Sequence, residues 1–109
     1  NQLSMKVIIT QTAEDSLEEI YRYKCEYSVA HADEFLSNIY AFTTENLSQF
    51  PRLGHVYNPE RGLFRLIYAK AFNIYYTIRE QAVFVLFIID GSISLNQELA
   101  DPTVRLPEL

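Results

Sequence analysis

The strongest pattern in the chain is an alternation of apolar and polar residues in its C-terminal half, which predicts three β-strands. From residue 72 to residue 79 every second side chain is Phe, Ile or Tyr, and the side chains between them are Asn, Tyr, Thr and Arg. A period of two residues is typical of a strand with one buried face. Leu63–Tyr68 and Ala82–Asp90 flank this segment across short turns. The second of them is apolar on both faces, which indicates a strand in the middle of a sheet.

The N-terminal half predicts one further strand and two helices. Lys6–Thr10 is a short run rich in β-branched residues, as expected for a strand. Thr12 is expected to cap a helix that runs to about Tyr27, because apolar positions recur there at steps of three and four. A second helix is expected over Ala30–Phe50, where Pro51 ends it.

Together these elements predict an α+β fold with the order β-α-α-β-β-β. A helical hairpin is expected to pack on one face of a mainly antiparallel four-stranded sheet. Residues 51–62 contain two prolines and two glycines and are expected to form a loop. A turn near Lys70 would place Arg65 opposite Tyr75. The residues of the last strand expected to face the helices are Val83, Val85, Phe87 and Ile89.

The opposite face of the sheet is also expected to be largely apolar. Its residues would be Arg65, Ile67, Tyr75, Thr77, Phe84, Leu86 and Ile88. A large apolar patch of this kind is rarely left in water. Either the tail from Ser92 to Leu109 folds back over this face, or a partner protein covers it.

Composition and charge limit the classes of function. The chain has 109 residues, which argues for one domain, and its single cysteine, Cys25, excludes an internal disulfide. We expect residues 1–4 to be a cloning remnant before Met5, residues 5–90 to be the domain and residues 91–109 a tail. No run is long and apolar enough to span a membrane, so a cytoplasmic location is expected. The net charge of −5 disfavours binding to phosphate backbones, including direct sequence-specific binding of nucleic acid, and favours a protein partner.

Residues for catalysis or for metal binding are sparse. His31 and His55 lie in different segments and have no second ligand at a metal-binding spacing, and Cys25 has no histidine close to it in sequence. No glycine-rich phosphate loop is present. We therefore expect no metal, no cofactor and no catalytic residues. The remaining candidates for contacts with a target are the cations Arg61, Arg65, Lys70 and Arg79; the alternative is that they are scattered solubilising charges.

Several short motifs, in this order, resemble the RelE/ParE superfamily of bacterial toxin–antitoxin and plasmid-stabilisation modules. They are the opening strand with Ala13, Leu17, Ile20 and Tyr23 after it, Phe50-Pro51-x-x-Gly54, Phe64-Arg65, Ile74-Tyr75-Tyr76-Thr77-Ile78, and the apolar strand from Val83 to Ile89. The resemblance extends from Met5 to Asp90. It implies the same fold as the residue pattern does.

The resemblance also implies a function. RelE-like members cut messenger RNA on the ribosome with a cluster of Lys and Arg, whereas Asn73, Ser92 and Ile93 stand where this chain would need basic residues. ParE-like members bind and inhibit DNA gyrase. The resemblance therefore favours a ParE-like toxin that inhibits gyrase without catalysis.

The same resemblance implies a cognate antitoxin that neutralises the toxin by covering the apolar face. Its expected contacts are Ile67, Tyr75, Phe84, Leu86 and Ile88. A homodimer, or a heterotetramer with the antitoxin, is compatible with this interpretation. Two alternatives stay open: a RelE-like ribosome-dependent messenger RNA endonuclease, and a degenerate relative that binds a partner without being toxic.

Overall fold

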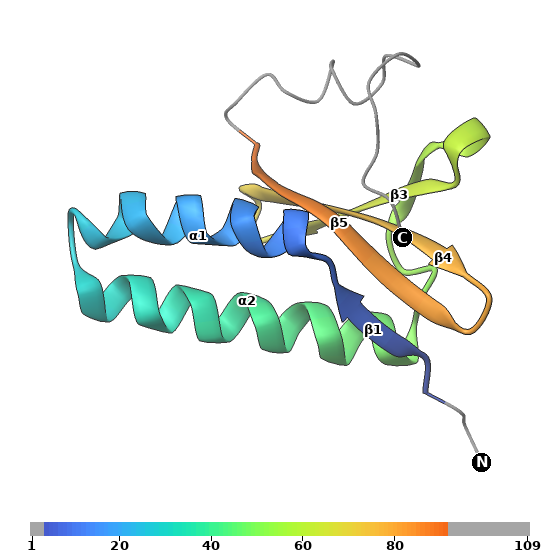
Figure 1. Cartoon of the computed structure of the whole chain (residues 1–109), viewed down its shortest axis with the longest axis horizontal. Coiled ribbons are helices and arrows are strands. Elements are labelled where there is room, and N and C mark those ends of the chain that lie inside the picture. Colours follow the sequence, from blue (N-terminus) through green and yellow to red (C-terminus); the bar gives the residue numbers. More distant parts are fainter. Residues whose placement is uncertain (1–3, 92–109) are drawn as a thin grey trace.

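The computed structural model describes residues 4–91, which form two helices and one five-stranded sheet (Figure 1). The order of elements is β1 (Lys6–Ile9), α1 (Gln11–Cys25), α2 (Val29–Gln49), β2 (His55–Asn58), a 3-10 turn η1 (Pro59–Arg61), β3 (Leu63–Tyr68), β4 (Phe72–Arg79) and β5 (Ala82–Asp90). The strand order in the sheet is β1-β5-β4-β3-β2. Strand β1 is parallel to β5, and the other neighbouring strands are antiparallel. None of the helices within residues 4–91 has both the length and the apolar character that crossing a membrane requires.

The predicted order of elements is confirmed, but the sheet has five strands instead of four. The additional strand, β2, falls in the segment that was expected to be a loop. It pairs with β3 at the edge of the sheet, with His55 opposite Arg65 and Val56 opposite Phe64, and a bulge follows Val56. Four residues between a glycine and a proline are too few to show an alternating pattern, so this strand depends on the neighbour that pairs with it.

Both helices begin at a hydroxyl cap. The side chain of Thr10, not of Thr12, caps α1, because its Oγ1 accepts a hydrogen bond from the backbone N–H of Ala13 at 3.3 Å. The same hydroxyl donates to the carbonyl oxygen of Val85 at 2.7 Å and so ties the helix start to β5. Ser28 caps α2 by accepting from the N–H of His31. The two helices lie side by side and cover one face of the sheet (Figure 1).

The main core lies between the helices and this face of the sheet. The first hairpin has the predicted register, with Arg65 opposite Tyr75. The buried residues of this core are Ala13, Leu17, Ile39, Leu47, Phe64, Leu66, Phe72, Ile74, Tyr76, Val83, Val85 and Ile88. Its centre is Ile74 and Tyr76 of β4, both fully buried.

A β-bulge in the central pair of strands changes which residues of β5 face the helices. Tyr76 lies opposite Val85 but Tyr75 lies opposite Phe87, so that Leu86 is the extra residue. An inserted residue inverts the alternation beyond it. The prediction that Phe87 and Ile89 face the helices is therefore wrong, as is the placement of Ile88 on the opposite face. The prediction for these three residues assumed that side chains alternate between the two faces along the whole of β5, and the bulge breaks this alternation.

Gly54 sits where the backbone leaves no room for a side chain. Its N–H donates to the hydroxyl of Tyr76 at 2.9 Å. A Cβ added at this position would lie 2.7 Å from the carbonyl oxygen of Arg65 and 2.9 Å from the Tyr76 hydroxyl. The glycine of the Phe50-Pro51-x-x-Gly54 motif thus allows the chain leaving α2 to pass close to the sheet.

The turn between β3 and β4 holds two residues in the left-handed region. Ala69 has φ 55° and Lys70 has φ 58°. Positive φ at both central residues is the pattern of a type I′ turn, which favours asparagine and glycine. A non-glycine residue there has a conformational cost of roughly 1 kcal/mol.

We predict that Gly54→Ala lowers the free energy of unfolding by roughly 1–3 kcal/mol, because the new Cβ would collide with the backbone of β3. Urea denaturation followed by circular dichroism measures this change. Gly62→Asn is the matched control: Gly62 has φ 65°, a conformation that asparagine tolerates, and a Cβ added there would lie 3.4 Å from the Thr77 hydroxyl. Equal stability of the Gly54→Ala variant and the original protein would contradict the close approach.

We predict that Lys70→Gly raises the free energy of unfolding by about 0.5–1 kcal/mol, since glycine adopts positive φ without a steric cost. The same substitution at Glu80, which has φ 57° in the β4–β5 turn, should act in the same direction. Ala41→Gly, on the exposed side of α2, should have the opposite effect. A Lys70→Gly variant that is less stable in chemical denaturation would show that the lysine side chain contributes to the fold.

Candidate functional site

The face of the sheet that the helices do not cover has its own apolar cluster. Leu63, Tyr75, Leu86 and Ile89 are buried there, and Tyr57, Phe84 and Phe87 are partly buried against them. We call the side of the sheet on which these seven residues lie the second face. The ring of Tyr57, from β2, meets the ring of Tyr75 edge-on with 5.1 Å between their centroids. The edge strand that the sequence pattern missed therefore supplies part of this cluster.

Arg65 is the cation that belongs to the second face. Its guanidinium lies over the ring of Tyr57, 5.4 Å from the ring centroid, and it stands opposite Tyr75 in the hairpin. Its Nε is buried and has no hydrogen-bond partner within residues 4–91. Burial raises the pKa of Tyr75 to about 12, and a negative charge on Tyr57 would act in the same direction, whereas neighbouring Arg65 acts in the opposite direction. Arg65 and the two tyrosines thus form one packed group.

The five expected antitoxin contacts differ in accessibility. Ile67 is 44% exposed and Phe84 is partly exposed, so both offer surface to a partner. Tyr75 and Leu86 are on the expected face but are fully buried or nearly so, and Ile88 belongs to the core under the helices. The expected cover by the tail concerns residues outside the described range. As contacts, the five residues stay a prediction.

The four expected target contacts do not form one cluster. Lys70 is exposed in the turn before β4 and Arg79 is exposed at the far end of that strand. Eight residues of strand separate these ends by roughly 23 Å. Arg61 precedes Gly62, whose carbonyl oxygen accepts a hydrogen bond from Thr77 at 2.7 Å, so it lies toward the Arg79 end. Arg65 lies between the two ends of the sheet.

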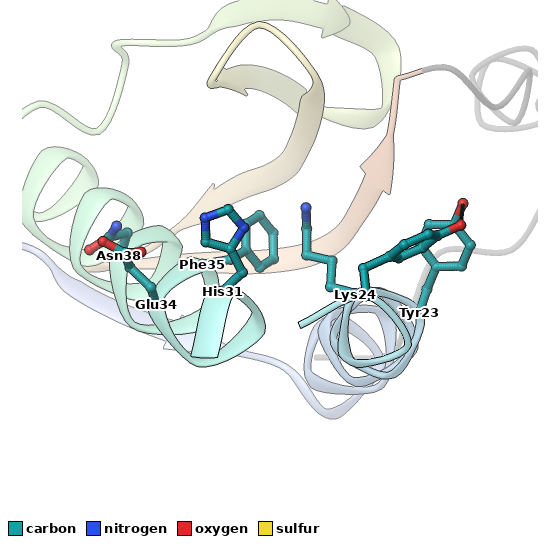
Figure 2. A pocket seen from close by; sticks show the side chains of 7 residues that line it. Tyr23, Lys24, His31, Glu34, Phe35 and Asn38 are labelled. Carbon is teal, nitrogen blue, oxygen red and sulfur yellow. Dashed lines mark hydrogen bonds between the residues drawn. The ribbon is translucent and has the colours of Figure 1, made fainter. Parts of the chain in front are cut away.

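A second candidate surface, at the tip of the helical hairpin, was not singled out from the sequence. Tyr23 and Tyr27 are 60% and 76% exposed, their ring centroids are 5.5 Å apart and their hydroxyls 3.4 Å apart. An open pocket of about 440 Å³ lies beside them (Figure 2), lined by Tyr23, Lys24, Tyr27, His31, Glu34, Phe35 and Asn38. The available signal was the spacing of the two tyrosines, four residues apart, which brings residues together on a helix and here places Tyr27, in the turn after α1, beside Tyr23.

Lys24 and His31 are two of the residues that line this pocket. The ammonium group of Lys24 lies 4.7 Å from the ring centroid of Phe35 and 5.3 Å from that of Phe72. Figure 2 shows Lys24 reaching into the space between the helix ends, with His31 and Phe35 across from it on α2. Within residues 4–91, no three of the His, Cys, Asp and Glu side chains gather as metal ligands would.

Comparison with known proteins identifies the family to which this chain belongs. Residues 7–95 match the model of the ParE toxin of the type II toxin–antitoxin system parDE. Toxin ParE3 of Caulobacter vibrioides is 28% identical over 98 residues, which is 90% of this chain and 98% of that toxin.

Two solved structures share the fold. A chain of the chromosomal ParDE toxin–antitoxin system from P. aeruginosa has a TM-score of 0.67 at 18% identity, over 82% of this chain and 98% of that one. A chain of the toxin–antitoxin complex RelBE2 from Mycobacterium tuberculosis has a TM-score of 0.64 at 20% identity, over 83% and 94%. The fold is that of the RelE/ParE superfamily. Within it, this chain belongs to the ParE toxin family of type II toxin–antitoxin systems.

We predict that the stability of the protein falls as the pH rises from about 10 to about 12. The pKa of Tyr75 is raised from its ordinary value of 10.0 to about 12, and burial also raises that of Tyr76. A group whose pKa is higher in the folded state stabilises the fold below its unfolded pKa, and this contribution is lost as the pH passes through the folded value. Chemical denaturation at pH 9, 10 and 11 measures it. Tyr75→Phe should weaken this pH dependence, and a variant with an unchanged slope would contradict the prediction.

Proposed function

We propose that this chain is a ParE-like toxin that acts in the cytoplasm by binding and inhibiting DNA gyrase, and that a cognate antitoxin neutralises it. The family match supports the toxin class. The solved relatives come from toxin–antitoxin systems and complexes, which supports an antitoxin as partner. The proposed choice of gyrase rests on the way in which the cations of this chain are distributed.

The separation of the cations is the observation that carries the proposal. Cleavage of RNA needs charged groups that converge on one phosphate and a positioned acid or base beside it. Lys70 and Arg79 lie at opposite ends of β4, while Arg65 packs over the ring of Tyr57. Such an arrangement suits contacts spread over a protein surface more than it suits a hydrolytic centre.

The proposed contacts follow from accessibility. For the target we propose Arg61 and Arg79, which lie toward one end of the sheet, and Arg65, which lies between the two ends and packs over the ring of Tyr57. For the antitoxin we propose Ile67 and Phe84, the two expected contacts that keep exposed surface. An antitoxin that covers these residues would lie next to the target-binding cations and would block them.

A direct test is to express the full chain from a tightly controlled promoter in bacteria and to follow growth, plasmid supercoiling and transcript ends. We expect growth arrest, loss of supercoiling by purified gyrase in the presence of the purified chain, and intact transcripts. Transcript ends that appear in codon register would support a ribosome-dependent endonuclease and contradict the proposal. Healthy cells with unaffected gyrase would also contradict it and would indicate a non-toxic relative.

Single substitutions test the proposed target contacts. Arg79→Ala should weaken gyrase inhibition roughly fivefold to thirtyfold, the effect expected for loss of an interface arginine worth 1–2 kcal/mol. Arg22→Ala is the control, because Arg22 is exposed on α1 and pairs with Glu18 there. Equal inhibition by the Arg79→Ala variant and the original chain would remove Arg79 from the contact surface.

Testing Arg65 as a target contact requires a substitution that retains its positive charge. It is half-buried over Tyr57, so Arg65→Glu would place an unpaired carboxylate in a packed group and would disturb the fold. Arg65→Lys retains the charge and the stem, and it removes the planar guanidinium.

A further inference from the structure

The outer side of α1 combines exposed aromatic rings with negative charge. Asp15, Glu19, Tyr23 and Tyr27 follow one another at intervals of four residues, and all four are exposed. Residues at this spacing share one side of a helix, and Tyr27, in the turn just after α1, keeps its ring next to that of Tyr23. With Glu26, the exposed C-cap of the helix, we call these residues the α1 stripe.

A groove lies beside the α1 stripe, between α1 and strand β5. Strand β1 pairs with β5 only as far as Val85, and α1 begins directly after β1, so the helix runs beside the remaining part of β5. An open groove of about 450 Å³ lies between them, lined by Thr12, Asp15, Ser16, Glu18, Glu19, Arg22 and Phe87. A separate pocket lies beside Tyr23 and Tyr27 at the hairpin tip, and Lys24 and His31 are among the residues that line it. The partly buried ring of Phe87 supplies an apolar wall.

Most of the charged side chains on this surface are negative. Asp15, Glu18, Glu19 and Glu26 are all exposed carboxylates. The single arginine among them, Arg22, already pairs with Glu18 at 2.6 Å. Lys24 is directed away from the stripe, onto the rings of Phe35 and Phe72.

Tyr23 and Tyr27 lie near the carboxylates of the α1 stripe. The pKa of Tyr23 is raised above its ordinary value, first by the hydrogen bond with Tyr27 and by that residue's charge, and further by Glu26 and Asp90. Glu26 precedes Tyr27 in the turn after α1, and Asp90 is the last residue of β5. An aromatic face with carboxylates beside it attracts a guanidinium or an ammonium group, because the ring quadrupole and the negative charges act together.

Charge decides between the possible occupants. A second copy of the chain carries a net charge of −5, and residues 92–109 carry Glu98, Asp101 and Glu108 against Arg105, which is −3 + 1 = −2. Neither brings a net positive charge to the α1 stripe. We propose that the α1 stripe and its groove bind a basic, amphipathic segment of a partner protein, with arginine on the tyrosine rings and an apolar side chain against Phe87. In so far as that partner is the antitoxin, the inference rests on the proposed function.

The test is a titration of the full chain with a fluorescein-labelled 18-residue peptide of Leu, Ala and Arg, patterned as an amphipathic helix. Tyr27→Ala and Glu19→Gln should each weaken binding roughly fivefold to tenfold, since one removes an exposed ring and the other a carboxylate. Phe50→Ala and Glu45→Gln are the matched controls, because both residues are exposed and lie near the other end of α2. Their affinities should equal that of the original chain. In ¹⁵N-labelled protein, shift changes should fall on residues 15–27 and 86–90.

Several results would overturn the inference. They are the absence of binding at millimolar peptide, equal affinity of the Tyr27→Ala variant and the original chain, shift changes located elsewhere, and equally tight binding of a peptide with Glu in place of Arg. Self-association that Tyr27→Ala abolishes would instead identify a second copy as the occupant. The titration measures neither growth nor gyrase, so a toxic chain that does not bind the peptide refutes only this inference. A chain that binds the peptide but is not toxic refutes only the proposed function.

Discussion

The packing of the helical hairpin onto β4 and β5 is the contact on which the other features depend. Ile74 and Tyr76 of β4 are fully buried beneath it, together with Val83 and Val85 of β5. Burial of apolar surface on this scale is the main source of stability for a domain of this size. It also sets the orientation of every neighbouring strand, because residues that alternate with the buried ones must point to the opposite face. The second face with Tyr75 and Arg65 is a consequence of that core.

The hydroxyl of Tyr76 connects this core to the edge of the sheet. It accepts the N–H of Gly54, so that the chain leaving α2 turns close to β3 and can add β2 as an edge strand. Strand β2 brings Tyr57 next to Tyr75 and under the guanidinium of Arg65. The one arginine in the middle of the second face is thereby held by aromatic packing. This position suits a role in recognition more than one in moving protons.

Charge is distributed differently over α1 and over the sheet. Exposed carboxylates and Tyr23 lie on α1, with Tyr27 in the turn after it. Arg61 and Arg79 lie toward one end of the sheet, where the exposed Glu60 and Glu80 precede and follow them in sequence, so that this end is of mixed sign. A partner of positive charge is therefore attracted to α1 more than to the sheet.

The sequence by itself determined the order of elements, both helices, the three C-terminal strands and the register of Arg65 opposite Tyr75. These features follow from local periodicity and from turn residues, which act over a few neighbours. Tertiary structure alone decided three others: the pairing of β2, the bulge that leaves Leu86 unmatched, and the burial of Tyr75 and Leu86. It also showed that Lys70 and Arg79 are far apart, that Tyr23 and Tyr27 border a pocket at the hairpin tip, and that α1 and Phe87 of β5 border a groove. Strand pairing and burial depend on residues distant in sequence, and one inserted residue inverts a face without changing the pattern that predicts the strand.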